Sequence, residues 1–392
     1  MHVAIVSEEY PPAPHGGSGA SYRDLAEGLV LAGHSATVIG VSTTQPQPVR
    51  VDAEQNGVRV IRLPRAHPRL GYRLGGWWER WKLRRVLAQE HARARFDVVE
   101  ASDYNGWLSH GGVDGIPGIV RIRGSNLFFD SELARKPSLF EHRHERAALI
   151  RATHLASVSR FAADRTLALV GLSERECPII PNGIDTQRFS PSPDVPVENE
   201  LVVFVNTVNP RKGIEELVDA ANEILPLRPA ARFVAIGDDT QSRTGAYIAK
   251  LRDRIRPELR SRFEFLGRIP REDVIPWLRR AAVCCYPSHM ETFGIAPLEA
   301  MSVGRPTIFS KTGPGPEVVE DGVSGLLCDP CDAKDIARCI TTIFDDPQLA
   351  QRLGAAARAR VLAGFDRRDW VERNVAFFEN CCASFSKNGR RW

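Results

Sequence analysis

The chain has 392 residues, which is too long for one ordinary hydrophobic core and favours two domains. Hydrophobic residues make up 43% and charged residues 26% of the sequence, which excludes a disordered or fibrous chain. The net charge of +4 gives no general reason to expect nucleic acid as a partner. The first residues contain neither a basic start nor a long apolar run, so we expect no signal peptide and a cytoplasmic location.

The first half of the chain alternates short apolar runs with helix-length segments, which predicts a parallel β-sheet covered by helices. The apolar runs are residues 3–6, 36–41, 58–63, 98–100, 119–122 and 155–158. The loop after the first run contains Gly16-Gly17-Ser18-Gly19 and leads into a predicted helix over 20–32. Glycines at this edge of a sheet let the backbone approach a phosphate closely. A dinucleotide-binding fingerprint would need a glycine where Tyr22 stands, so we expect no NAD at this loop.

Residues 62–95 are strongly basic and also carry three tryptophans. They contain nine arginines and one lysine against two glutamates. One interpretation is an ordinary amphipathic helix, whose tryptophans fill the core while its arginines stay in solvent. The other is a peripheral contact with an anionic membrane surface, or with an anionic substrate. No nucleic-acid-binding module accompanies the stretch, so we do not expect nucleic acid as a partner.

Two acids and an arginine mark the ends of later strands in this half. Glu100 ends the run at 98–100, and Asp103 follows it beside Tyr104. We expect Glu100 and Asp103 to orient or deprotonate a hydroxyl group, although Asp103 equally suits the cap of the next helix. Arg123 follows the run at 119–122 and suits a phosphate or carboxylate group on a substrate.

The alternation restarts in the second half, which predicts a second sheet of the same kind. Its apolar runs are residues 201–205, 232–236, 262–265, 283–286, 307–309 and 325–327. Residues 190–196, between the two series, are rich in proline and serine and predict an interdomain linker. We therefore expect two α/β domains, at 1–190 and 197–365.

The stretch 291–299 is the most informative motif in the chain. It sets Glu291 and Glu299 eight positions apart, the first on a loop and the second inside a predicted helix over 296–301. Backbone N–H groups of Gly294, Ile295 and Ala296 would stand at the positive end of that helix, where a diphosphate is held well. Glu299, about one turn further on, would reach a diol. A nucleotide sugar offers both groups, a diphosphate and a ribose.

This motif, continued through residue 307, resembles the donor-site signature of the retaining family-four glycosyltransferases of the GT-B fold. Other segments match the family in the same order. They are Tyr10-Pro11-Pro12 with Gly16-Gly17-Ser18-Gly19, then Ile180-Pro181-Asn182-Gly183-Ile184-Asp185, Arg211-Lys212-Gly213, Gly267-Arg268-Ile269-Pro270 and residues 313–318. The resemblance implies two doubly wound, Rossmann-like domains facing a cleft, the first binding the acceptor and the second the nucleotide sugar. It also implies that the last helix, within residues 366–392, returns to the first domain.

The resemblance assigns roles to individual residues of the second domain. It implies that Lys212 neutralises the leaving diphosphate, that Glu291 holds the donor sugar's hydroxyl groups and that Glu299 holds the ribose. The nucleobase would rest against the backbone near Arg268 and Ile269. The full set of implied donor-binding residues is Gly17, Arg211, Lys212, Arg268, Ile269, Glu291, Phe293, Gly294, Ile295, Ala296 and Glu299.

The sequence departs from the family pattern at two places. The arginine expected shortly before Lys212 is replaced by Asn206 and Thr207, for which Arg211 is the candidate substitute. The histidine expected in the first domain is replaced by Arg123. The expected acceptor-binding residues are Asp103, Tyr104 and Arg123, and the expected catalytic residues are Lys212, Glu291, Asp103 and Glu100.

The expected function is transfer of a hexosyl group from a nucleotide-diphosphate sugar to a hydroxyl of a glycan, a lipid-linked sugar or a small-molecule aglycone. We expect no metal and no other cofactor, because no two aspartates separated by one residue occur to grip a metal and a diphosphate. Cys328 and Cys331 have a metal-like spacing but no second pair, which indicates a surface turn. The alternatives are a sugar phosphorylase, a nucleotide-sugar epimerase, or a non-catalytic glycan-binding protein at a membrane surface.

Overall fold

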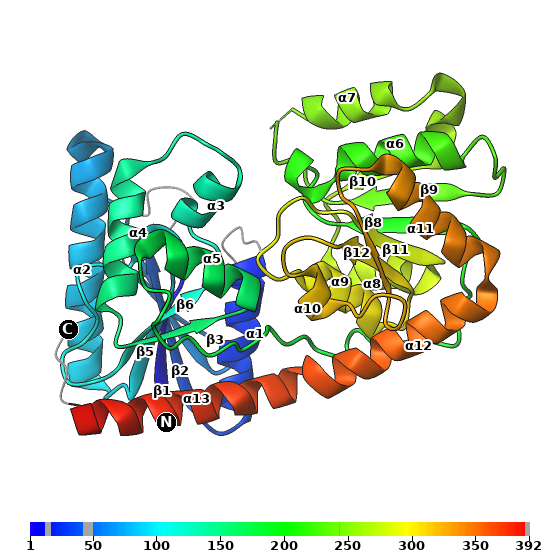
Figure 1. The fold of residues 1–392 in the computed structure, drawn as a ribbon. Helices are drawn as coiled ribbons and strands as arrows, with labels where there is room; N and C mark the ends of the chain where they lie inside the picture. Colours follow the sequence, from blue (N-terminus) through cyan, green and yellow to red (C-terminus); the bar gives the residue numbers. More distant parts are fainter. Residues whose placement is uncertain (12–16, 42–49, 243, 389–392) are drawn as a thin grey trace. The chain divides into compact units, whose positions relative to one another are not determined.

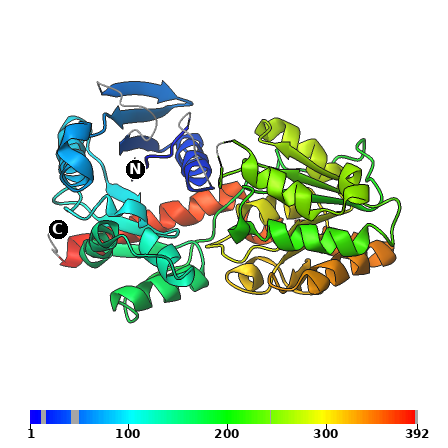
Figure 2. The same ribbon diagram turned by 90° about the horizontal axis from the view of Figure 1, so that it is seen from above.

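The computed structural model describes residues 1–11, 17–41, 50–242 and 244–388 (Figure 1 and Figure 2). Internal contacts divide the chain into two compact units. The first comprises Met1–Gly183 and Arg367–Trp392, and the second comprises Ile184–Asp366.

The first unit is built on a sheet of seven strands among the described residues. The strands are β1 (His2–Val6), β2 (Ser35–Val41), β3 (Val51–Gln55), β4 (Val58–Leu63), β5 (Val98–Ser102), β6 (Gly118–Ile122) and β7 (His154–Ser157). They lie in the order β3-β4-β2-β1-β5-β6-β7, and all neighbours are parallel except β3 and β4. The six predicted apolar runs are confirmed as the parallel strands, which are buried on both faces and therefore need continuous apolar sequence.

β3 is a strand that the sequence analysis did not predict. All of its residues are exposed or half-buried, as is usual for a strand at the edge of a sheet. It is joined to β4 by a turn at Asn56 and Gly57, whose φ angles of 51° and 76° are both left-handed. An Asn-Gly pair favours this hairpin turn, so a signal for β3 was present in the sequence.

Helices cover both faces of the first sheet (Figure 1). They are α1 (Gly17–Leu31), α2 (Gly71–Arg93), α3 (Asn126–Glu132), α4 (Leu139–Arg151), α5 (Arg160–Val170) and α13 (Arg367–Asn388). On one face α1 and α13 bury Leu25 and Trp370 in a cluster with Ile5. On the other face α2 and α4 bury Leu87 and Leu149 in a separate cluster. The first unit is therefore a three-layer structure with a core on each side of the sheet.

The second unit repeats this plan with a parallel sheet of six strands among the described residues. The strands are β8 (Leu201–Val205), β9 (Arg232–Ile236), β10 (Phe263–Gly267), β11 (Val283–Tyr286), β12 (Thr307–Ser310) and β13 (Leu326–Cys328), in the order β10-β9-β8-β11-β12-β13. The helices are α6 (Ile214–Ile224), α7 (Ala246–Arg254), α8 (Arg271–Arg280), α9 (Ile295–Ser302), α10 (Gly315–Val318), α11 (Ala333–Asp345) and α12 (Pro347–Gly364). No helix of either unit, within the described ranges, is long and apolar enough to cross a membrane.

Each sheet has one place where the strand order reverses. In the second unit the chain runs outward from β8 to β9 and β10, and then crosses to β11 on the other side of β8. In the first unit the same reversal lies between β1 and β5. Loops at the carboxyl ends of the two central strands diverge there and leave room for a ligand. These two reversal points are therefore where each unit is expected to bind its substrate.

The division between the units falls at Gly183 and Ile184, earlier in the chain than the linker expected at 190–196. The residues after this point pack into the second unit. Phe189 is buried there, and its carbonyl accepts hydrogen bonds from Ser302 (2.6 Å) and Arg358 (3.1 Å). The proline-rich composition of 190–196 thus marks a turn inside the second unit.

Gly213 follows the short 3-10 helix Pro210–Lys212 with a φ of 69°. A Cβ atom here would lie 1.8 Å from the carbonyl oxygen of Pro287. Gly213→Ala should therefore destabilise the second unit by about 3 kcal/mol or more, of which about 1 kcal/mol reflects the left-handed backbone. The matched control is Gly245→Ala, because Gly245 has a φ of 74° and open space at its Cβ position. Urea unfolding of both variants measures the difference, and equal losses would contradict the clash.

Candidate functional site

Lys212 and Glu291 meet where the strand order of the second sheet reverses. Lys212 ends the 3-10 helix after β8, and Glu291 lies on the loop after β11. β8 and β11 are paired neighbours, so the loops at their carboxyl ends lie side by side. Lys212 Nζ is 2.5 Å from Glu291 Oε1, and each side chain is 15% exposed. The two charges are thus largely shielded from solvent but still within reach of a ligand.

Backbone contacts hold these two loops together. The carbonyl oxygen of Arg211 accepts hydrogen bonds from the N–H groups of His289 (2.9 Å) and Met290 (3.3 Å). Gly213 lies against the Pro287 carbonyl of the same loop. The separation of the lysine and the glutamate is therefore fixed by the backbone as well as by their mutual attraction.

Two polar side chains complete the surroundings of Glu291. Its Oε1 atom accepts hydrogen bonds from Ser288 Oγ (3.4 Å) and Asn206 Nδ2 (3.5 Å). Asn206 stands at one of the two positions where the expected arginine is replaced, and its amide supplies a donor without a charge. Asn206 and Ser288 were not among the predicted site residues, although each closely follows the end of a central strand.

The loop that carries Glu291 leads directly into α9, whose N-cap residue is Gly294 and so offers no side chain to cap the first turn. Gly294, at the N-cap position, has a φ of 102°, and a Cβ atom there would lie 2.7 Å from the Phe309 ring. The next residues, Ile295 and Ala296, are half-buried. Backbone N–H groups without a side-chain cap attract anions, since they stand at the positive end of the helix dipole.

Phe293 has a different place from the one that the family resemblance implied. Its ring is buried and packs against Phe365, with 6.0 Å between the ring centroids. The ring therefore supports the turn before α9 from the interior of the unit and is not available to contact a donor.

Glu299 is buried on α9 and forms an ion pair with Arg271, the first residue of α8. The sequence analysis did not identify Arg271, because its partner lies on a different helix. A carboxylate held in this way accepts hydrogen bonds from hydroxyl groups, as the role predicted for Glu299 requires.

The two residues predicted to lie near the nucleobase come just before α8. Ile269 is half-buried, and Arg268 is exposed with its guanidinium 3.4 Å from Asp238.

In the first unit, two acids lie at the reversal between β1 and β5. Glu8 follows β1, and its carboxylate accepts a hydrogen bond from the Asn105 amide at 2.7 Å. Burial, reinforced by the charge of Glu9, raises the pKa of Glu8 to about 7. Asp103 follows β5, and burial raises its pKa to about 7 although it accepts a hydrogen bond from the Arg123 N–H at 2.9 Å. Glu8 is half-buried, and a pKa near neutral pH suits it to proton transfer. Asp103 is fully buried and holds the backbone of Arg123, which corrects the prediction that it contacts an acceptor hydroxyl.

Glu8 was not among the predicted site residues, because its burial depends on segments distant in the sequence. Tyr104, a predicted acceptor contact, is 37% exposed at this place. Burial and the nearby charges of Glu8 and Glu9 raise the pKa of Tyr104 to about 12.

The glycine-rich loop before α1 is described only in part. Gly17 is exposed at the start of α1, while Gly16 lies outside the described residues.

Glu100 belongs to the interior of the first unit and not to its surface. It is fully buried, and its two oxygens accept hydrogen bonds from Arg121, each at 2.7 Å. Arg121 also donates to Asn374 of α13 at 2.6 Å. The predicted catalytic role of Glu100 therefore gives way to a structural one, because a substrate would have to break a buried ion pair to reach it.

Arg123 is likewise an interior residue. Its guanidinium lies over the Tyr22 ring, 4.4 Å from the centroid, and donates to Ser21 Oγ (3.0 Å) and Asn182 Oδ1 (2.7 Å). These contacts connect α1 to Asn182, which lies just before the division between the two units. They correct the prediction that Arg123 contacts an acceptor group, since its side chain is used within the fold.

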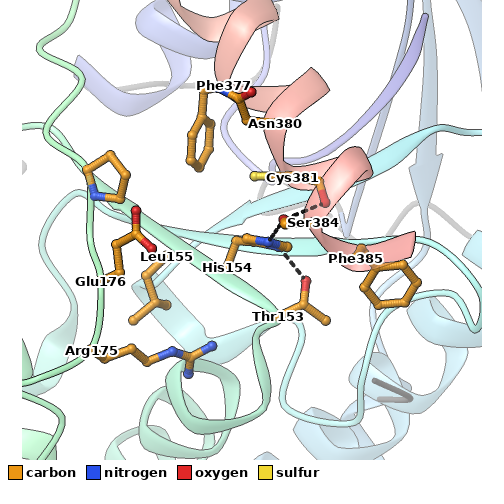
Figure 3. A pocket seen from close by; sticks show the side chains of 11 residues that line it. Thr153, His154, Leu155, Arg175, Glu176, Phe377, Asn380, Cys381, Ser384 and Phe385 are labelled. Atoms are coloured by element: carbon orange, nitrogen blue, oxygen red, sulfur yellow. Dashed lines mark hydrogen bonds between the residues drawn. The ribbon is translucent and has the colours of Figure 1, made fainter. Parts of the chain in front are cut away.

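A cavity of about 510 Å³ lies elsewhere in the first unit (Figure 3). It is lined by the start of β7, by residues 175–178 and by α13, including His154, Phe377 and Phe385. His154 is the first residue of β7, so the cavity lies at the edge of the sheet opposite Glu8 and Asp103. Ligands of open α/β sheets bind at the carboxyl ends of the strands, which sets this cavity apart from the candidate site.

Cys328 ends β13 and is buried, whereas Cys331 lies in the turn that follows and is exposed. Within the described part of the chain, no three His, Cys, Asp or Glu side chains gather closely enough to hold a metal ion. The spacing of the two cysteines is thus accounted for by burial of one and exposure of the other.

Two family models match the chain, and they meet close to the division between the units. The model described as Glycosyltransferase Family 4 matches residues 15–188, and the one described as Glycosyl transferases group 1 matches residues 185–360. Glycogen synthase from Mycobacterium tuberculosis is 27% identical over 392 residues, which cover 93% of this chain and 91% of that protein.

Solved structures share the fold. Sucrose-phosphate synthase from Thermosynechococcus elongatus matches with a TM-score of 0.82 at 25% identity, covering 98% of this chain and 100% of that one. Anabaena HepE, solved with UDP and glucose, matches with a TM-score of 0.76 at 21% identity, covering 96% and 99%. The fold and the site define a glycosyltransferase of the GT-B type. The chain belongs to the family-four glycosyltransferases.

The raised pKa of Glu8 predicts that stability changes with pH. Between its ordinary value of 4.5 and about 7, the folded protein keeps a proton that the unfolded chain has released, so stability from this group is lost as the pH rises. Glu8→Gln does not ionise and should gain roughly 3 kcal/mol over the wild type from pH 4 to pH 8. Thermal melts at several pH values test this, with the exposed Glu54→Gln as control. A pH-independent difference for Glu8→Gln would refute the assignment.

Proposed function

We propose that the protein transfers a hexosyl group from a nucleotide-diphosphate sugar to an acceptor hydroxyl, with retention of the anomeric configuration. The observation that carries the proposal is the Lys212–Glu291 pair, which lies beside the loop that leads into the first turn of α9, where glycine is the N-cap residue. It lies in the unit matched by the group 1 glycosyl transferase model. Donor binding is assigned to this second unit and acceptor binding to the first.

The donor's diphosphate would bind at the first turn of α9, where the N–H groups and the helix dipole favour an anion. In the free protein Lys212 and Glu291 satisfy each other. A bound donor offers each a new partner, a phosphate oxygen for the ammonium group and sugar hydroxyls for the carboxylate. Glu299, held by Arg271, would accept hydrogen bonds from the ribose, and the backbone near Ile269 would support the base.

The reaction requires stabilisation of a leaving diphosphate. The bond between the anomeric carbon and the diphosphate oxygen breaks, a bond to the acceptor oxygen forms, and the hydroxyl proton passes to the departing phosphate. Negative charge grows on the diphosphate as the first bond breaks, so Lys212 and the α9 amides act where they are most effective. These groups would serve in place of a metal ion, and we propose that no metal is needed.

The acceptor is proposed to be a glycan, a lipid-linked sugar or a small-molecule aglycone. Asp103, Tyr104 and Glu8 gather at the reversal point of the first sheet, which supports acceptor binding there. Tyr104 is the exposed member and would contact the acceptor, while the half-buried Glu8 would orient its hydroxyl group. Asp103 would support this place from the interior.

Removal of the Lys212 charge should impair the chemical step. Lys212→Met is expected to lower kcat by about 100-fold to 1000-fold, because the leaving diphosphate loses a cation. The matched control is Lys311→Met, since Lys311 forms a 2.9 Å ion pair with Asp329 at the exposed surface of the same unit. Steady-state kinetics should show the control within about twofold of the wild type. A Lys212→Met enzyme with unchanged kcat would disprove the assigned role.

The configuration of the product tests retention and the metal-free mechanism in one assay. With an α-linked nucleotide sugar as donor, an acceptor, and excess EDTA, NMR spectroscopy should show an α-glycosidic product formed at an undiminished rate. A β-linked product would exclude retention, and full loss of activity in EDTA would exclude the metal-free mechanism. Donor turnover that needs inorganic phosphate instead of an acceptor would identify a phosphorylase.

A further inference from the structure

α2 carries a stripe of large apolar side chains on its outward face. The stripe consists of Leu70, Leu74, Trp77 and Trp81, which are 41%, 68%, 49% and 41% exposed. Their spacing of four, three and four residues places them on one side of a helix. Leu70 directly precedes α2, which lies along one side of the first unit in light blue (Figure 1).

The opposite face of the helix makes the contacts with the core. Leu83, Val86 and Leu87 are buried in the cluster that covers the first sheet. The interpretation in which the tryptophans fill the core is therefore wrong for Trp77 and Trp81. Burying the stripe would remove apolar surface from water, which is favourable, so the exposed arrangement calls for a partner.

Basic residues border the stripe on both sides. At 100° per residue, Arg73 and Arg84 fall along one border, and Lys82 and Arg85 fall along the other. The guanidinium of Arg85 lies 5.6 Å from the centroid of the Trp81 ring, so charge and aromatic surface face the same way. From Gly71 to Arg85 the sequence contains a single acid, Glu79, and its carboxylate accepts the backbone N–H of Ala66.

We propose that this stripe and its basic borders bind the surface of an anionic lipid bilayer. Tryptophan and leucine side chains enter the boundary between headgroups and acyl chains, where an aromatic ring is favoured. Lysine and arginine on either side then meet negative headgroups. The helix would lie in the plane of the interface with its opposite face still packed on the sheet.

The charge pattern decides against a second copy of the chain as the occupant. A two-fold contact brings the same patch of both copies together, so the arginines of one stripe would face those of the other. An anionic surface satisfies these charges, whereas a like-charged surface does not. The stripe shares no residue with the donor site, so failure of either proposal leaves the other intact.

Co-sedimentation with vesicles tests the proposal on the full chain. Protein should pellet with vesicles that contain about 30% phosphatidylglycerol and not with pure phosphatidylcholine vesicles, and raising NaCl from about 0.1 M to about 0.5 M should weaken binding. The combined variant Leu74→Ser, Trp77→Ser and Trp81→Ser should lose at least about tenfold in partition coefficient. Its melting temperature should stay near that of the wild type, because the three side chains are exposed.

The matched control replaces three exposed leucines outside the stripe, Leu31, Leu227 and Leu362, by serine. This control should bind vesicles like the wild type. If the stripe variant does not fold, the combined Arg73→Gln, Arg84→Gln and Arg85→Gln variant replaces it, and should weaken binding to anionic vesicles.

Two outcomes would overturn the proposal. One is equal vesicle binding by the wild type and the stripe variant. The other is a wild-type dimer, measured by analytical ultracentrifugation, that the stripe variant abolishes while neither protein binds vesicles.

Discussion

The ion pair between Lys212 and Glu291 is the interaction on which the proposed donor site depends. The reversal between β8 and β11 brings the two loops to one place, and the Arg211 carbonyl fixes them there. A charge that is mostly shielded from water is costly without a partner. Each residue therefore offsets the cost of partly burying the charge of the other. An anion with neighbouring hydroxyl groups is the kind of ligand that can replace both partners at once.

The two units have the same kind of strand-order reversal but carry different residues there. The reversal point of the second sheet gathers a cation and a helix start with glycine as its N-cap, which is the setting proposed for the donor's diphosphate. The reversal point of the first sheet gathers Glu8 and Asp103, whose pKa values are raised to about 7 by burial. Strand order thus determines where each proposed site lies, while the residues at the strand ends determine whether it suits an anion or a proton transfer.

The positions of the parallel strands could be predicted from the sequence, because each strand is a continuous apolar run with a turn at its end. The placement of Glu291 on a loop and of Glu299 inside the following helix could also be predicted, because both depend on local sequence. β3 was missed because its residues are polar at a sheet edge, and its Asn56-Gly57 turn was the signal to use. Local sequence patterns were therefore enough to predict those elements whose formation depends on residues close together in the sequence.

Residues whose role depends on distant partners could not be placed from the sequence. Glu100 and Arg121 are about twenty positions apart and look like two surface charges, yet they form a fully buried pair. Asn206 and Ser288 reach Glu291 only because β8 and β11 are adjacent. The burial that raises the pKa of Glu8 is likewise a property of the packed unit and not of its neighbours in the chain.

α13 closes the first unit with the last residues of the chain. Trp370 and Phe378 fill the core over β1, and Asn374 accepts a hydrogen bond from Arg121. A ribosome makes the opening strands first, but these side chains emerge only after the whole second unit has been synthesised. α1 is made early and covers part of this face, so the apolar surface that α13 buries is the part still exposed until the final helix is made. The last helix to be synthesised therefore completes the core beside β1, which is the first strand to be synthesised.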